Sequence, residues 1–246
     1  MSEAINLYLK QISSKLQLIK NNHSQYSDVA CKVVDAIENG NSIYVFGASH
    51  AGIITEELTY RAGGLAIFNP IFNPSLMVNI TPITLTSDLE KLPNFGKKII
   101  ESSKLKQGDI LFIHSVSGRN HVIIDAAITA KSLGATIIGL TSVDTNNRVT
   151  SKHPSGHLLI DIVDFVLDNY VDYGDACTSI SGVKQSVAPL STVLGTTIAN
   201  SLVLAITEQF VARGIAPPVL ASANLDGNAE INRQIFEKYQ QQIHYL

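Results

Sequence analysis

The sequence predicts an α/β protein, a three-layer α/β/α domain built on a five-stranded parallel sheet. Five short, largely apolar runs have the length of buried strands, and they lie at residues 42–46, 65–68, 109–113, 135–140 and 163–168. Segments with the apolar spacing of helices separate several of these runs. Apolar strands that alternate with helices are typical of a parallel sheet that is covered on both faces.

Composition limits the possible classes of function. The chain has 246 residues, of which 45% are hydrophobic and 16% are charged, enough for one large domain with extensions. A net charge of −3 gives no electrostatic reason to expect nucleic acid or an anionic membrane as partner. No apolar run is long enough to span a bilayer, and no signal-peptide core is visible. Cys31 and Cys177 form neither a metal motif nor a disulfide framework, so we expect a cytoplasmic protein with reduced thiols.

Residues 2–39 are predicted to be helical, with a break near residues 21–24 and a stop at Gly40. Their apolar face is broad for helices that precede an α/β core. It packs either on its own domain or on a neighbouring subunit, and the sequence leaves both possibilities open. We therefore separate residues 1–40 from a core domain of residues 41–215 and a C-terminal extension of residues 216–246.

Within the core domain, helices are predicted at residues 53–61, 95–103 and 121–134. Residues 69–95 carry four of the eight prolines and are expected to be irregular, apart from a short helix near residues 87–92. Residues 169–189 form a long polar loop, a candidate lid or an arm that reaches a partner's site. Ser191 is expected to cap a long apolar helix over residues 192–212, and a last helix passes through Ile231 and Phe236.

Two turns rich in Ser and Gly follow the first and third predicted strands, at residues 47–52 and 115–120. A strand, such a turn and a helix start together form an anion site, because the first helical N–H groups point at whatever lies there. Ser117 or Asn120 could instead simply cap the helix. The first turn lacks the full glycine fingerprint of a dinucleotide site and the Lys of a nucleotide P-loop. Both turns are expected to line one crevice where the strand order reverses.

Residues 44–64, 115–120 and 134–142 resemble the sugar isomerase (SIS) domain, which carries a Ser-x-Ser-Gly turn after one strand and a Thr-Ser or Thr-Asn ending on the next. The chain is similar above all to uncharacterised bacterial SIS-domain proteins once grouped as a family of unknown function. Residues 56–65, 151–156 and 222–227 carry that closer likeness. The resemblance implies the SIS-type, flavodoxin-like arrangement of a five-stranded parallel sheet.

The resemblance also implies phosphosugar binding. In the family the Ser-x-Ser-Gly turn and the helix start behind it hold the phosphate. The residues expected to contact substrate or phosphate here are Ser49 in the first turn, Ser115, Ser117, Gly118 and Asn120 in the second, and Thr141 and Ser142 after the next strand. Asn120 stands where many members carry Thr.

Isomerisation between aldose and ketose needs a group that moves a proton between adjacent carbons. By resemblance we favour Glu57 as this base, with His50 of the first turn as a second catalytic candidate. Glu56 lies about 100° around the same helix, so we expect it to be exposed or paired with Arg61. An ordinary surface pair is the plain alternative for both carboxylates.

The first turn departs from the family pattern, since Ser49 replaces a glycine and Ala51 replaces a serine. Gly52 and Ile231 stand where the closer group has histidines. The leading expectation is a protein that binds and isomerises a phosphorylated sugar or amino sugar. The alternatives are a non-catalytic phosphosugar-binding or sensor protein, and a lyase or etherase acting on an N-acetylamino-sugar phosphate. We expect no cofactor and no metal, and a homodimer or homotetramer joined by the N-terminal helices.

Overall fold

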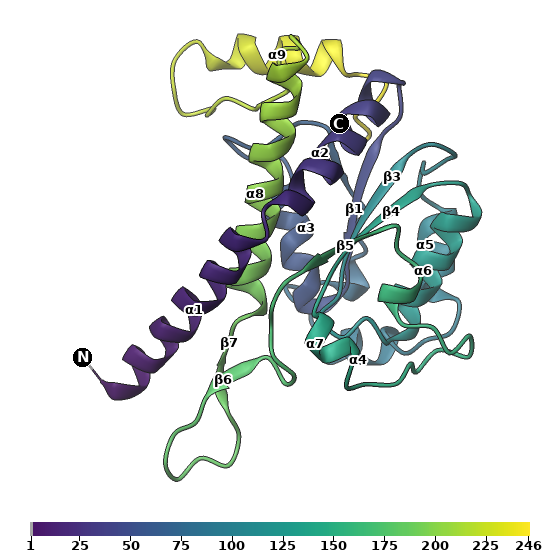
Figure 1. Ribbon diagram of the computed structural model, residues 1–246. Coiled ribbons are helices and arrows are strands. Elements are labelled where there is room, and N and C mark those ends of the chain that lie inside the picture. Colours follow the sequence, from purple (N-terminus) through teal and green to yellow (C-terminus); the bar gives the residue numbers. More distant parts are fainter. Residues whose placement is uncertain (1) are drawn as a thin grey trace.

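Five parallel strands form the central sheet of the computed structural model, which describes residues 2–246 (Figure 1). Their bounds are β1 Ile43–Gly47, β2 Phe68–Pro70, β3 Ile110–His114, β4 Thr136–Thr141 and β5 Phe165–Asp168. The spatial order β2-β1-β3-β4-β5 places β2 on one side of β1 and β3 on the other, so the order reverses between β1 and β3. The predicted five-stranded parallel sheet is confirmed.

Helices cover both faces of the sheet. The helical segments are α1 Glu3–Asn21, α2 Ser24–Glu38, η1 Ser49–Ala51, α3 Gly52–Leu58, η2 Pro74–Leu76, α4 Leu85–Leu89, α5 Phe95–Glu101, α6 His121–Ser132, α7 Val143–Asn146, η3 Leu159–Asp161, α8 Ser191–Ala212 and α9 Asn228–Lys238. Side chains alternate along β1, so Ile43 and Val45 join the core under α2, α3 and α8, whereas Tyr44 and Phe46 join the core under α5 and α6 (Figure 1). The two cores confirm the three-layer architecture.

The N-terminal helices differ in how far they are buried. Seven residues of α2 are buried in the core shared with α8, whereas Ile19 alone is buried among the residues of α1. Ile5 and Leu9 of α1 are about half exposed, and the helix projects from the body of the molecule (Figure 1). No helix among residues 2–246 is long and apolar enough to cross a membrane.

Residues 242–245, near the C-terminus, are hydrogen-bonded to the edge strand β2. The side chain of Asn69 in β2 donates to the carbonyl of Gln242 at 2.8 Å and accepts from the amide of His244 at 2.6 Å. The Gln242 side chain donates to the carbonyl of Ile37 at the end of α2. Since these residues, α2 and α8 share one core with the sheet, no separate core marks the proposed boundaries at residues 40 and 215, and the domain division stays a prediction.

Three local predictions were wrong. The second strand begins at Phe68 rather than at residue 65, because the backbone at residues 63–66 bonds to residues 218–220 instead. Ser191 does not cap α8, since Leu190 holds that position and the Ser191 hydroxyl donates to Asp175. The loop expected at residues 169–189 contains a short antiparallel hairpin, β6 Ala176–Thr178 with β7 Val187–Pro189.

Candidate functional site

The turn after β3 is held in one conformation by its own residues. Gly118 has a positive φ of 55°, and a Cβ placed there would lie 2.8 Å from the Cβ of Leu159. Only glycine fits without displacing a neighbour. The amide of Gly118 donates to the Ser115 hydroxyl oxygen at 3.1 Å, which closes the turn ahead of α6. A rigid turn can present its remaining polar groups in a fixed arrangement.

Those remaining groups are mostly unused donors. Within residues 2–246, the amide N–H groups of Ser117, Arg119 and Asn120 donate to no protein atom, and the Ser117 hydroxyl makes no hydrogen bond. The buried Nε of Arg119 also lacks a partner. Behind them begins α6, a helix of 12 residues whose N-terminus carries about half a positive charge. This set of groups is complementary to an oxyanion such as a phosphate.

A cavity of about 400 Å³ opens in front of this turn. Ser117, Arg119 and Asn120 form one wall, and Lys152 from the loop after α7 adds a second cation. The amide of Lys152 donates to the carbonyl of Arg119 at 3.0 Å, so this loop is fixed to the turn. Two cations and free N–H groups make this wall electropositive.

Residues 173–175 also line the cavity. The carboxylate of Asp175 accepts from the amides of Leu190 and Ser191 and from the Ser191 hydroxyl, at 3.0, 2.8 and 2.6 Å. Its charge is therefore matched by the start of α8. Lys152 and Asp175 are contributions that the sequence did not single out, although Lys152 lies in the distinctive 151–156 stretch.

The turn after β1 starts beside the turn after β3 but does not line the same cavity. Gly47 and His114 are register partners, and the His114 Nδ1–H donates to the carbonyl of Ala51 at 3.1 Å. The Ser49 hydroxyl lies 3.3 Å from the Thr86 hydroxyl of α4, and His50 is exposed. Neither side chain lines the cavity at Ser117, so the expectation of one crevice shared by both turns does not hold in this conformation.

The α4 region explains this separation. Thr86 of α4 contacts the first turn, while the carboxylate of Glu90, which follows α4, accepts from the Asn120 amide at 2.6 Å. The carbonyl of Glu90 also accepts from the amide of Val122. One short segment is thus in contact with both turns. Asn120 holds the N-cap position of α6 without a side-chain cap, so the simple capping role does not apply to it.

The side chain of Glu57 faces α8 rather than either turn. Its Oε1 accepts from the guanidinium of Arg61 and from the Asn200 amide at 2.8 Å. Glu56 is exposed. This exposure is one of the two alternatives expected for Glu56, and the partner of Arg61 is Glu57, which lies four residues before it on the same face. A catalytic role for Glu57 or His50 stays a prediction.

Thr141 and Ser142 are fully buried, and neither lines the cavity at Ser117. The Thr141 hydroxyl donates to the carbonyl of Val116 at 3.2 Å. The Ser142 hydroxyl donates to the carbonyl of Val171 and accepts from the amide of Thr145, which caps α7. Both residues hold the loops around the cavity, and their direct contact with phosphate stays a prediction.

No histidine among residues 2–246 lines the cavity at Ser117. His114 is buried, and this burial lowers its pKa from 6.5 to about 4, so its ring is neutral. His153 bonds to the carboxylate of Asp125 at 3.1 Å and packs edge-on against His121. Residues 2–246 contain no group of three or more His, Cys, Asp and Glu side chains that could hold a metal ion.

Known protein families and proteins match this chain over more than half of its length. The SIS domain family matches residues 7–142. A UPF0309 protein of Oceanobacillus iheyensis is 49% identical over 97% of this chain and 99% of its own length. A second UPF0309 protein, from Shouchella clausii, is also 49% identical, over 98% of this chain and 99% of its own length.

Two solved structures share the fold at low sequence identity. A phosphoheptose isomerase from Francisella tularensis is 17% identical with a TM-score of 0.52, over 85% of this chain and all of its own. The Vibrio vulnificus NanR protein, solved in complex with ManNAc-6P, is 14% identical with a TM-score of 0.51, over 95% of this chain and 68% of its own. At this identity the likeness concerns the fold alone.

Proposed function

Because this chain belongs to the SIS domain family, we propose that it binds a phosphorylated sugar or amino sugar, with the phosphate on the turn of residues 115–120. The observation that carries the proposal is the set of unused donors at Ser117, Arg119 and Asn120, which face a cavity of about 400 Å³. Arg119 and Lys152 add positive charge, and the sugar then lies toward residues 173–175. The two serines have different roles, because Ser117 lines the cavity whereas Ser115 closes the turn.

The test begins with a thermal-shift screen of sugar phosphates, including glucosamine 6-phosphate, fructose 6-phosphate, N-acetylmannosamine 6-phosphate and sedoheptulose 7-phosphate. A ligand that binds only the folded state must raise the unfolding temperature. The matching unphosphorylated sugars serve as controls. If no sugar phosphate shifts the transition, or if the free sugars shift it equally, the proposal is wrong.

Calorimetry of Ser117→Ala then locates the phosphate. Removing one hydrogen bond to a charged group should weaken affinity by about 1.5 to 3 kcal/mol, roughly ten- to more than a hundredfold. Stability should be unchanged, since the Ser117 hydroxyl has no partner in the protein. Ser179→Ala, an exposed serine in the hairpin loop, is the matched control and should bind like the wild type.

Isomerisation is the finer part of the proposal. Glu57 would act as proton-transfer base after its bonds to Arg61 and Asn200 rearrange. Exchange of the ligand's C1 or C2 hydrogen with deuterated water, monitored by NMR, reports this step directly. Glu57→Gln should slow exchange by about 10²- to 10⁴-fold while binding survives. Glu56→Gln, at the exposed neighbour, is the control.

A non-catalytic phosphosugar-binding protein is the second candidate. It is favoured by the position of Glu57 against α8 and by Ser49, whose hydroxyl contacts Thr86 rather than the cavity. Binding with no hydrogen exchange in the wild type would select this function. A lyase or etherase would instead release a second product from an N-acetylamino-sugar phosphate ether, which the same NMR experiment detects.

A further inference from the structure

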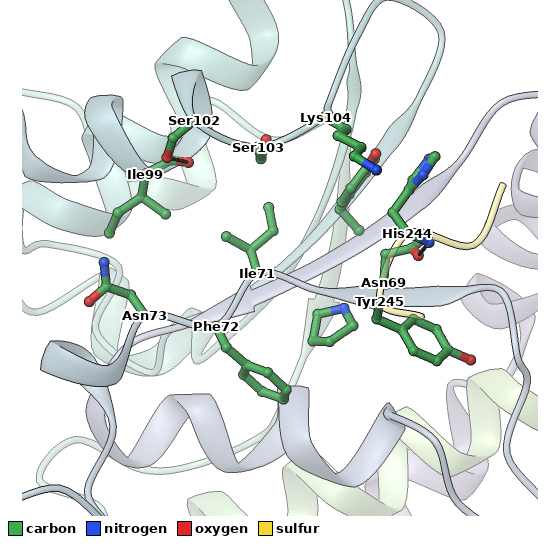
Figure 2. Close-up of a pocket in the computed structure, with 12 residues that line it drawn as sticks. Asn69, Ile71, Phe72, Asn73, Ile99, Ser102, Ser103, Lys104, His244 and Tyr245 are labelled. Atoms are coloured by element: carbon green, nitrogen blue, oxygen red, sulfur yellow. Dashed lines mark hydrogen bonds between the residues drawn. The ribbon is translucent and has the colours of Figure 1, made fainter. Parts of the chain in front are cut away.

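A second cavity, of about 320 Å³, lies at the β2 edge of the sheet (Figure 2). It is lined by Tyr44 of β1, by β2 and the residues that follow it, by the end of α5, and by His244 and Tyr245. It shares no lining residue with the cavity at Ser117. Tyr44 also precedes the end of β1 by three residues, roughly 10 Å of strand. The two cavities are therefore separate sites.

The hydroxyl of Tyr44 is a buried polar group without a partner. Tyr44 is 3% exposed, yet its hydroxyl makes no hydrogen bond within residues 2–246. Its ring stacks on that of His244, with centroids 5.7 Å apart and planes 10° from parallel, which fixes the direction of the hydroxyl. Burial, and next the nearby Asp109, raise the pKa of Tyr44 well above its usual range, so the group remains a neutral donor. A buried donor left unpaired costs stability unless a ligand accepts from it.

The free polar groups that line this cavity are donors. Lys104 is its one charged lining residue, and no ion pair within residues 2–246 engages it. The Ser102 and Ser103 hydroxyls donate to the carbonyls at the end of α5, at 3.0 and 2.7 Å. Asn69 is fully occupied by backbone groups of three segments. No protein atom within residues 2–246 accepts from the Tyr44 hydroxyl, and no carboxylate lines the cavity beside Lys104.

Apolar side chains complete the walls. Ile71, Phe72 and Ile99 line the cavity, and Figure 2 shows Lys104 and His244 at the side away from Asn73. The volume lies at the lower end of the roughly 300 to 1,000 Å³ that small-molecule sites occupy. An occupant must therefore be small, apolar in its body and rich in acceptors at one end.

We propose that this cavity binds a small anion with an apolar body, a carboxylate or phosphate ester whose oxygens accept from the Tyr44 hydroxyl and from Lys104. The body of the ligand packs on Ile71, Phe72 and Ile99. This site is independent of the proposed sugar-phosphate site, so either one can exist without the other. The structure provides a donor pair for the anionic group and an apolar wall for the remainder.

Ligand-observed NMR and calorimetry with three probes test the proposal. Benzoate represents the carboxylate, phenyl phosphate the phosphate ester, and benzyl alcohol is the neutral control. We expect at least one anion to bind, and benzyl alcohol to bind more than tenfold more weakly. The stronger of the two anions identifies the head group. A specific site should bind its anion with a Kd below about 10 mM. If neither anion binds at about 10 mM, the proposal is wrong.

Variants locate the binding. Tyr44→Phe removes only the hydroxyl, and Lys104→Gln removes only the charge, so each should weaken the anion about tenfold or more. Lys106→Gln, an exposed lysine outside the lining, is the control and should stay within twofold of the wild type. Equal effects at Lys104 and Lys106, or none at Tyr44, would contradict the site.

Two further measurements distinguish a ligand-binding Tyr44 from a purely structural one, and the second cavity from the cavity at Ser117. Without ligand, Tyr44→Phe should be at least as stable as the wild type, because the hydroxyl is unpaired, whereas a structural role for the hydroxyl predicts a loss. Ser117→Ala should leave binding of the anionic probe unchanged. If Ser117→Ala abolishes probe binding, the probe occupies the sugar-phosphate site and the second site is refuted.

Discussion

Gly118→Ala should destabilise the protein far more than an ordinary substitution of glycine. The positive φ of 55° costs an L-residue about 1 to 2 kcal/mol. The added Cβ would also meet the Cβ of Leu159 at 2.8 Å and the side-chain oxygen of Asn146 at 3.1 Å. Leu159 is fully buried, so it cannot move aside freely, and overpacking of this kind costs about 1 to 3 kcal/mol. The expected total is about 2 to 5 kcal/mol.

Gly156→Ala is a matched control for this substitution. Gly156 has a φ of 76°, but no atom lies within 4 Å of the position that its Cβ would take. It should therefore cost only the backbone part, about 1 to 2 kcal/mol. Urea unfolding followed by circular dichroism gives both free energies of unfolding. If the two variants lose the same stability, the contact between Gly118 and Leu159 is not what fixes the turn.

The other predictions concern assembly, pH and the anchor of α8. Ile5 and Leu9 of α1 stay about half exposed, so we expect a homodimer or homotetramer, and a monomeric mass by light scattering at micromolar concentration would contradict this. The pKa of His114 is 6.5 in the unfolded chain and about 4 in the folded one, so stability should fall by roughly 3 kcal/mol as pH drops through this window, with a shallower slope in His114→Gln. Asp175→Ala should cost about 2 to 4 kcal/mol in urea unfolding, because it leaves three donors at the start of α8 unpaired, whereas Asp172→Ala, at an exposed carboxylate, should cost less than about 1 kcal/mol.

Local patterns in the sequence predicted the strands of the sheet, but they did not predict where every apolar segment would pair. The runs at β1, β3 and β4 are largely apolar, and a strand buried on both faces needs no other signal. Leu65 to Ile67 have the same composition, yet their backbone bonds to residues 218–220. That pairing depends on where the segment after α8 lies in the fold. A local sequence pattern holds no information on this position.

The sequence likewise predicted part of the candidate site, namely the turn, but not the residues that other loops contribute. The Ser and Gly pattern located the turn of residues 115–120, because glycine and hydroxyl residues have local reasons to be there. Thr141 and Ser142 have the same kind of side chain, but they are buried and their hydroxyls donate to the carbonyls of Val116 and Val171. Lys152 and Asp175 reach the cavity from separate loops, so their role became visible only with the fold.

The bonds between Asn69 and residues 242–245 affect how the protein is made. Gln242 and His244 follow Asn69 by 173 and 175 residues, and a ribosome adding about 5 to 20 residues per second reaches them roughly 9 to 35 s later. During that interval the Asn69 side chain lacks the two backbone partners that it later acquires. The edge of the nascent sheet at β2 therefore stays incomplete until residues 242–244 have been synthesised, and a chaperone that binds exposed strand edges could act there during that interval.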